Sequence, residues 1–136
     1  MSSASPATVE APSTIYHLAQ KQDWEKAVAE ERDYFTDSLE KEGFTHATAE
    51  TKLILTIANA FYQSAPGDFV LLVIDTPKLS SKVVMEKGDA PLPGSNDPEP
   101  PTCPHILGKI EQMAVRAVKQ VTREEGTGKF LSIEME

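Results

Sequence analysis

The sequence has little histidine, arginine and cysteine, and it lacks a long apolar run. Its single Cys103 cannot form an internal disulfide, so nothing indicates a secreted, disulfide-framed fold. No stretch approaches the roughly 18 apolar residues that cross a bilayer, which disfavours a membrane-spanning helix. Residues 1–14 also lack the basic start and apolar segment of a signal peptide. These absences predict a soluble, cytoplasmic protein without a membrane partner.

Basic residues are outnumbered by acidic ones. The chain holds 21 Asp and Glu against 13 Lys and Arg, a formal charge of −8, and only three residues are arginine. A surface that follows a phosphate backbone needs clustered Lys and Arg, so the composition disfavours nucleic acid as a partner. A basic series recurs in the C-terminal segment, and its usual meaning is a solvated face: Lys109, Arg116, Lys119 and Arg123.

The length of 136 residues and the 40% hydrophobic content fit one globular domain. Residues 1–13 are small and polar, which predicts a disordered tail before a domain over residues 14–133. Six of the ten prolines lie between Pro91 and Pro104, so we expect residues 88–104 to be a loop without regular structure. Such a loop is either a functional lid or a mobile insertion.

Apolar periodicity predicts several strands and two main helices. Strands are expected at 15–19, 44–47, 69–74, 81–86, 105–110 and 130–133, and helices at 20–30 and 49–63. Thr48 is expected as the N-cap of the second helix, and residues 32–42 as mostly loop. Residues 113–121 fit a helix or a strand. Because these elements do not alternate regularly, they predict an α+β fold with a mixed, mostly antiparallel sheet.

The common catalytic and nucleotide-binding signatures are absent. Neither GxGxxG nor the phosphate-loop pattern occurs, and there is no GxSxG elbow or HExxH pair. The chemistry must therefore be sought in residues that are separated along the chain.

The three histidines are the best candidates for a site. His17, His46 and His105 each lie within or beside an expected strand. A single histidine in such a place is usually a hydrogen-bonded core residue, but three together predict a shared cleft, since imidazole donates, accepts and titrates near neutral pH. Glu86 is a carboxylate that can complete this cleft, although a solvated surface position explains it equally well.

Two hydroxyls and one thiol extend the candidate set. Ser38 and Thr48 suit hydrogen bonds to a ribose or phosphate, while turn and capping roles explain them equally well. Cys103 and the three histidines supply four possible zinc ligands. However, Cys-x-His is not a usual zinc pair and Cys103 ends the proline-rich loop, so we expect no metal site.

A series of short blocks resembles the uncharacterised family called domain of unknown function 952. The blocks are residues 15–18, Trp24, 34–39, 42–48, 58–62, 70–75, 82–86 and 104–108. The resemblance covers about residues 15–133 and implies a strand at 115–121. The chain departs from the family at Met85, where an aromatic residue is usual, and in the proline-rich stretch, which looks like an insertion. The family carries no established activity.

The family is also similar in fold to ADP-ribosyltransferases and to NAD-using RNA 2′-phosphotransferases. That likeness implies a split sheet with NAD, or a related nucleotide, as the ligand. Candidate ligand-binding residues are His17, Ser38, His46 and Thr48, and candidate catalytic residues are His46, Glu86 and His105. Enzymatic activity is left open. A non-catalytic module that binds a small ligand or a protein is the alternative, and purely structural histidines are a third interpretation.

Overall fold

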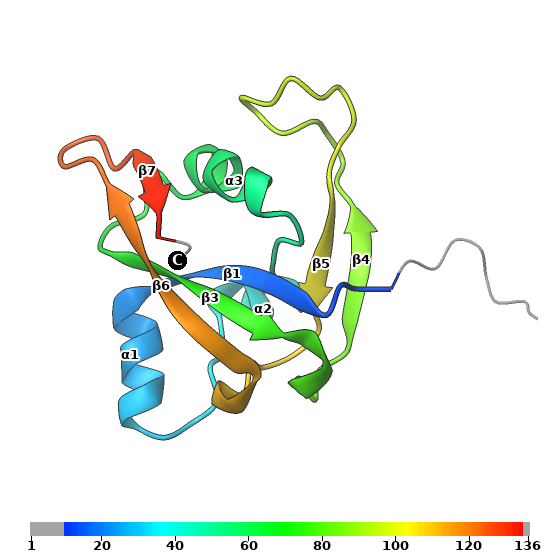
Figure 1. The fold of residues 1–136 in the computed structure, drawn as a ribbon, viewed down its shortest axis with the longest axis vertical. Helices are drawn as coiled ribbons and strands as arrows, with labels where there is room; N and C mark the ends of the chain where they lie inside the picture. Colours follow the sequence, from blue (N-terminus) through cyan, green and yellow to red (C-terminus); the bar gives the residue numbers. More distant parts are fainter. Residues whose placement is uncertain (1–9, 135–136) are drawn as a thin grey trace, which may run out of the picture.

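The computed structural model describes residues 10–134 (Figure 1). Residues 1–9 of the predicted disordered tail lie outside this range, and residues 10–13 contain no helix or strand. Every helix and strand of the described part falls between Thr14 and Ile133. Within residues 10–134, no helix combines the length and apolarity that crossing a membrane requires.

The part of the chain that the structure describes contains seven strands and three α-helices. The strands are β1 (Thr14–Gln20), β2 (Thr45–His46), β3 (Phe69–Asp75), β4 (Val83–Lys87), β5 (Thr102–Ile106), β6 (Val115–Arg123) and β7 (Phe130–Ile133). The helices are α1 (Lys21–Ala29), α2 (Asp37–Glu42) and α3 (Ile54–Phe61), with short 3₁₀ turns η1 (Thr51–Leu53), η2 (Thr76–Lys78) and η3 (Gln112–Ala114).

The strands form two antiparallel sheets. One has the order β1-β3-β6-β7 and the other the order β2-β5-β4. Helix α1 lies on one face of the four-stranded sheet and α3 on the opposite face (Figure 1). The predicted α+β class, with two main helices, is confirmed.

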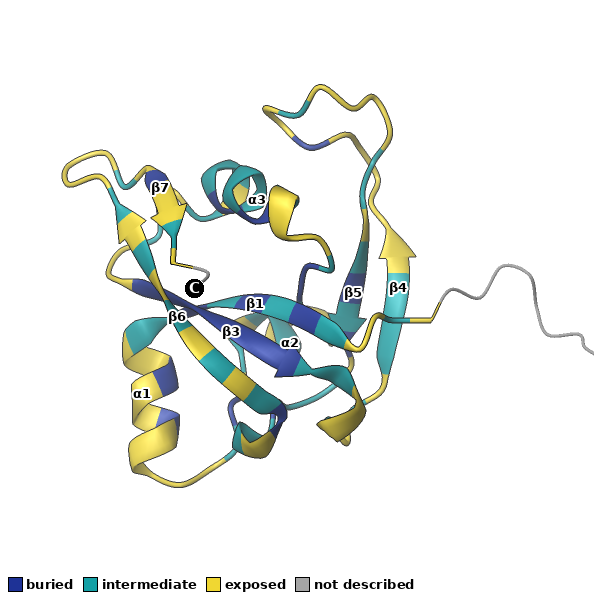
Figure 2. Ribbon diagram, viewed as in Figure 1, coloured by how far each residue is buried: buried dark blue, intermediate teal, exposed yellow. Residues whose placement is uncertain are grey.

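Strand β3 is the centre of both hydrophobic cores, as its continuous apolar run predicts. Val70, Leu72 and Ile74 pack toward α1, where Trp24 and Ala27 cover them. The alternate residues face α3, and Phe69 joins a second cluster there. Because both faces of β3 are covered, all of its residues from Phe69 to Ile74 are buried (Figure 2).

The prediction that residues 32–42 are mostly loop is wrong for their second half, which forms α2. The Thr36 hydroxyl accepts a hydrogen bond from the backbone N–H of Leu39, which caps the helix. Gly43 has φ of 88° and ends it in the left-handed conformation. A six-residue helix with this little apolar periodicity depends on its caps, so hydrophobic patterning did not reveal it.

The prediction of Thr48 as a helix N-cap is also wrong. Thr48 exchanges two backbone hydrogen bonds with Tyr16 at 2.8 and 2.7 Å, so it extends a sheet rather than starting a helix. Helical structure begins only at the 3₁₀ turn Thr51–Leu53, and α3 ends at Phe61, two residues earlier than expected. Non-local pairing therefore overrides the local capping signal.

The proline-rich loop is shorter than predicted, because β5 begins at Thr102 and includes Pro104. The carbonyl of Pro104 accepts from Ala47 at 3.1 Å, on the side where β2 ends. In an antiparallel strand, the N–H and the C=O of one residue face the same neighbouring strand. The N–H that proline lacks would therefore face the chain beyond His46, where β2 has already ended. The ambiguous segment 113–121 is the strand β6, as the family resemblance implies.

Candidate functional site

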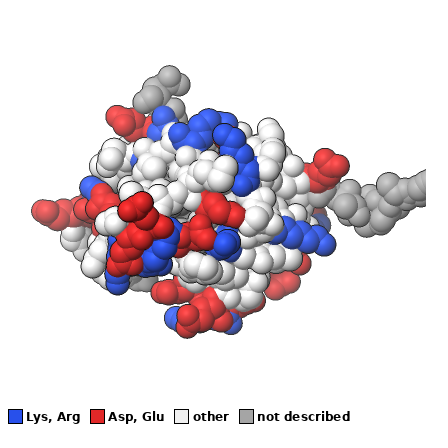
Figure 3. All heavy atoms as spheres, turned by 90° about the horizontal axis from the view of Figure 1, so that it is seen from below, with Lys and Arg blue, Asp and Glu red and all other residues white. Residues whose placement is uncertain are grey.

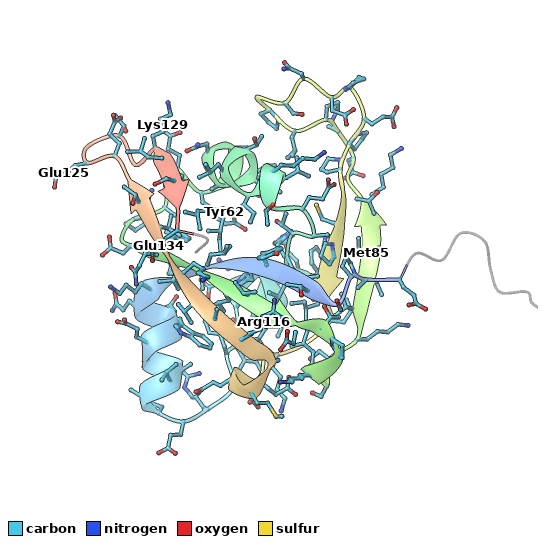
Figure 4. All side chains as sticks on the ribbon, in the orientation of Figure 1. Tyr62, Met85, Arg116, Glu125, Lys129 and Glu134 are labelled. Atoms are coloured by element: carbon cyan, nitrogen blue, oxygen red, sulfur yellow. The ribbon has the colours of Figure 1, made fainter. Side chains whose placement is uncertain are left out.

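A cleft of about 1030 Å³ opens where the two sheets meet. Residues 45–48 join them: Thr45 and His46 pair with β5, and Thr48 pairs with Tyr16 of β1. One wall comes from β1 and the end of α3, including Tyr62, which is labelled in Figure 4. The opposite wall comes from β4, β5 and the start of the loop between them. The volume is at the upper end of the range for small-molecule sites.

The structure brings every candidate site residue to this cleft. The lining includes His17 from β1, Ser38 from α2, His46 from β2, Thr48 beside it, Glu86 from β4 and His105 from β5. These residues span most of the chain, yet their strands converge at one gap. The shared cleft expected from the three histidines therefore exists in the fold.

His17 is buried and its tautomer is fixed. Its Nδ1 lies 2.6 Å from the carbonyl oxygen of His46, and since a carbonyl only accepts, Nδ1 carries the proton. Burial lowers the pKa of His17 to about 4, despite the opposing effect of this hydrogen bond. The ring is therefore neutral at physiological pH, and its Nε2 is an acceptor.

His46 and His105 are direct cross-strand partners on β2 and β5. Their ring centroids are 5.5 Å apart in an edge-to-face arrangement. The ring of Phe44 stacks on His105 with the centroids 4.0 Å apart. The three rings hold one another in place at the cleft wall.

Each of these two histidines has a carboxylate partner. The Nδ1–H of His105 donates to Oε1 of Glu86 at 2.5 Å, and the Nε2–H of His46 donates to Oε2 of Glu42 at 3.3 Å. In both rings the other nitrogen makes no hydrogen bond within residues 10–134. A carboxylate that orients an imidazole is a common device for general base catalysis and for ligand binding.

The two predicted hydroxyls differ in availability. The Ser38 hydroxyl donates to the carbonyl of Phe44 at 2.9 Å, so it stabilises the turn before β2. Thr48 is 8% exposed, and its side chain forms no hydrogen bond within the described part of the chain. Thr48 is therefore the better candidate for a ligand contact.

The sequence interpretation missed Tyr34. This residue is 6% exposed, lines the cleft and lies 5.9 Å from the His17 ring, centroid to centroid. Its hydroxyl has no hydrogen-bond partner among residues 10–134. Burial, followed by the charges of Asp23 and Asp37, raises the pKa of Tyr34, so the hydroxyl stays protonated and can donate. Its place beside Ile110 depends on a distant backbone pairing that no local pattern signals.

Comparisons with known proteins match this fold to an uncharacterised family. The profile described as "Protein of unknown function (DUF952)" matches residues 18–118, most of the chain. The chain belongs to the DUF952 family. The resemblance expected over residues 15–133 is thus confirmed over that narrower range, and no curated protein matches the chain.

A crystal structure of CC0527 from Caulobacter crescentus resembles this DUF952 chain with a TM-score of 0.65. The two are 17% identical, and the alignment covers 87% of this chain and 93% of the other. A double mutant of CC0527 gives the same TM-score at 16% identity. At this identity the likeness shows a shared fold only.

The loop between β4 and β5 of this DUF952 chain lies partly over the cleft. Residues 88–93 and Pro101 line the cleft, and Leu92 is the one buried residue between residues 88 and 101. The N–H of Gly88 donates to the carbonyl of Pro101 at 2.9 Å, and Lys87 pairs with Glu99, which closes the neck of the loop. In Figure 1 this loop leans toward α3. Leu92 thus covers part of the cleft from the loop side.

Other candidate chemistry does not assemble. Among residues 10–134, no three His, Cys, Asp or Glu side chains are grouped to hold a metal ion. The basic series in the C-terminal segment is largely engaged, since Lys109 pairs with Asp33 and Arg116 with Asp75. On the face seen in Figure 3, acidic and basic side chains lie side by side.

Proposed function

We propose that the histidine-lined cleft binds NAD or a related nucleotide, with the base and ribose inside the cleft. The observation that carries this proposal is the buried, unpartnered Nε2 of His17 in the cleft lining. Because Nδ1–H is already donated to His46, Nε2 only accepts, and its partner must bring a hydroxyl or N–H donor. A ribose hydroxyl is such a donor.

The neighbouring groups suit the same ligand. Thr48 and Tyr34 are buried residues of the same cleft lining, and their hydroxyls are able to donate or accept. Phe44 and His105 provide stacked rings at the wall, next to which a planar base can pack. Buried polar atoms without protein partners are costly, so a ligand that satisfies them gains affinity.

The arrangement of the sheets supports the likeness to ADP-ribosyltransferases. The cleft lies at the gap between two antiparallel sheets, and its lining includes His17 on β1 and His46 on β2. The resemblance implies NAD as the ligand of a split sheet, and a cleft between two sheets offers a place for it.

The more specific proposal is that the cleft transfers the ADP-ribosyl group of NAD to water. Glu86 and His105 form a hydrogen-bonded pair in the cleft lining. In hydrolysis of NAD, the bond between ribose C1′ and the nicotinamide nitrogen breaks, and nicotinamide keeps the electron pair. Water forms the new C1′–O bond, its proton passes to Nε2 of His105, and the Glu86 carboxylate stabilises the cationic ribosyl centre.

A non-catalytic ligand-binding module is the second candidate. It is favoured by the engagement of Glu86, whose Oε1 already holds His105 and whose side chain is 54% exposed. A carboxylate that is open to water stabilises a cationic centre less than one in a closed site. Saturable binding of NAD without release of nicotinamide supports this candidate.

Calorimetry of NAD binding tests the proposal with matched variants. His17→Asn keeps a donor near the position of Nδ1 and removes the Nε2 acceptor, whereas Val118→Ala changes an exposed residue of β6 outside the cleft. We expect saturable binding to the native protein and to Val118→Ala. His17→Asn and His46→Ala should bind at least about tenfold more weakly, the cost of a lost hydrogen bond to a buried group. No binding to the native protein, or equal binding to all four proteins, overturns it.

A further inference from the structure

The cleft carries an excess of negative charge. Its lining includes five carboxylates but only two lysines. The carboxylates are those of Asp23, Asp37, Glu42, Glu86 and Asp89, and the lysines are Lys41 and Lys87. Lys87 is already paired with Glu99, 2.9 Å away, which does not line the cleft. A diphosphate needs clustered cations or N–H donors, so these surroundings disfavour it.

The three arginines are committed elsewhere. Arg32 pairs with Glu30 and Arg116 with Asp75. Arg123 donates to the carbonyls of Gly128 and Gln63 and lies over the Phe130 ring, 4.4 Å from its centroid. None of the three lines the cleft, so none is placed to hold a phosphate there.

Aromatic side chains concentrate in the same cleft. All three tyrosines and four of the five phenylalanines line it, Phe130 being the exception. Phe35 and Phe61 are 57% and 61% exposed, which is unusual for such apolar groups in a hollow surface. The faces of aromatic rings attract organic cations, and the attraction grows when nearby carboxylates share the site.

The cleft carboxylates also act on two of the tyrosines in the lining. The pKa of Tyr34 is raised by burial and then by Asp23 and Asp37, and the pKa of Tyr62 by burial and then by Glu42. A field that discourages a tyrosine from ionising also discourages a bound anion and favours a bound cation.

The cleft also holds buried polar atoms that lack protein partners. His17 is 7% exposed and Tyr34 is 6% exposed. Within residues 10–134, neither Nε2 of His17 nor the Tyr34 hydroxyl is hydrogen-bonded. These two atoms require a ligand that carries a polar donor beside its charge.

From this combination we infer that the cleft takes an organic cation bearing a hydroxyl donor and no phosphate. The inference rests on the proposed function and deepens it. Among nucleotide-related compounds, the pyridinium riboside has these properties, with its cationic ring between aromatic faces and carboxylates and its ribose hydroxyl at His17. The phosphates of a longer nucleotide then remain outside the cleft.

Calorimetry with a charge-matched ligand series tests the inference. Nicotinamide riboside is a cation, and its dihydro form has nearly the same shape without the charge. ADP-ribose retains the diphosphate but lacks the pyridinium ring, and benzyltrimethylammonium is an organic cation without a nucleoside. We expect nicotinamide riboside to bind at least as tightly as NAD and about tenfold more tightly than its dihydro form. ADP-ribose should show no saturable binding.

Isosteric variants test whether the carboxylates of the cleft attract the cationic ligand. Asp23→Asn and Asp37→Asn each remove one carboxylate of the cleft, and Asp68→Asn makes the same change at an exposed position outside it. Each cleft variant should weaken binding of nicotinamide riboside by about threefold or more, while Asp68→Asn should leave it unchanged. Equal effects of all three variants contradict the inference.

The outcomes separate this inference from the proposed function. If NAD binds while nicotinamide riboside does not, or if the dihydro form binds equally well, the cation inference is wrong and nucleotide binding stands. If only benzyltrimethylammonium binds, nucleotide binding and the requirement for a hydroxyl donor are both wrong, and only the preference of the cleft for an organic cation stands. Absence of binding by all of these ligands overturns both.

Discussion

The imidazole of His17 on β1 donates its Nδ1–H to the backbone carbonyl of His46 on β2, across 2.6 Å. This one hydrogen bond links the two sheets and fixes which nitrogen of His17 faces a ligand. It also keeps a neutral histidine in the interior, since burial lowers the pKa of His17 to about 4. Stability and ligand recognition therefore depend on the same side chain.

Stability should fall as the pH drops from about 6.5 to 4. The unfolded chain protonates His17 near its usual pKa of 6.5, while the folded protein resists until the pH is about 4, so the unfolded state binds more protons in that interval. The loss is on the order of 3 kcal/mol at pH 4 and absent above pH 7. Urea unfolding across this range measures it, and His17→Asn should have a correspondingly flatter profile. Parallel profiles for the two proteins contradict the account.

Thr36→Ala should destabilise the fold by about 1–2 kcal/mol. The Thr36 hydroxyl caps α2 through Leu39 and lies 2.8 Å from the Thr45 hydroxyl, which joins the helix to β2. Thr51→Ala, at an exposed position of η1 where the side chain forms no hydrogen bond within residues 10–134, should cost no more than about 0.5 kcal/mol. Chemical denaturation of both variants compares them, and equal losses would show that the cap does not hold β2.

Leu92→Ala should uncover the cleft. Cys103 is the chain's one thiol and lines the same cleft, so its alkylation by iodoacetamide reports access. Because burial raises the pKa of Cys103, the rates are best compared at pH 8.5, where some thiolate forms. We expect labelling several-fold faster than in the native protein, with Leu131→Ala, an exposed change on β7, as the control. An unchanged rate would indicate that Leu92 does not restrict entry.

Glu86→Gln should separate binding from catalysis. It removes the charge that orients His105 while leaving a side chain of the same size at a position that is 54% exposed. If the cleft hydrolyses NAD, nicotinamide release should fall by about a hundredfold, far more than the about threefold loss of affinity expected from removing one cleft carboxylate. Turnover by Glu86→Gln at the native rate rules out the catalytic role of this pair.

Much of the sheet could be predicted, because local sequence patterns identify several of its strands. The apolar run at 69–74 and the short, aromatic-rich apolar segment at 15–19 need no distant information to be recognised as strands. The convergence of the histidines was predictable for the same reason, since each interrupts or borders an apolar strand of one domain.

The remaining features depend on contacts between distant residues. Helix α2 is stabilised by Thr36 and its bond to Thr45, and Thr48 pairs with Tyr16 instead of capping a helix. Tyr34 reaches the cleft because its backbone pairs with Ile110. Leu92 is buried although its neighbours in the loop are exposed. Local propensity does not depend on such distant contacts, so they could not be predicted from a single sequence.

The most direct test of the central claim is ¹⁵N NMR of the histidine rings during titration with NAD and with nicotinamide riboside. In the free protein, the account predicts that His17 is neutral, with the proton on Nδ1 and an unprotonated Nε2. Saturating ligand should move the Nε2 resonance in the direction of an accepted hydrogen bond, while Nδ1 stays bonded to His46. A free protein protonated on Nε2, or an Nε2 resonance that does not respond to either ligand, would contradict the claim that His17 receives the ligand.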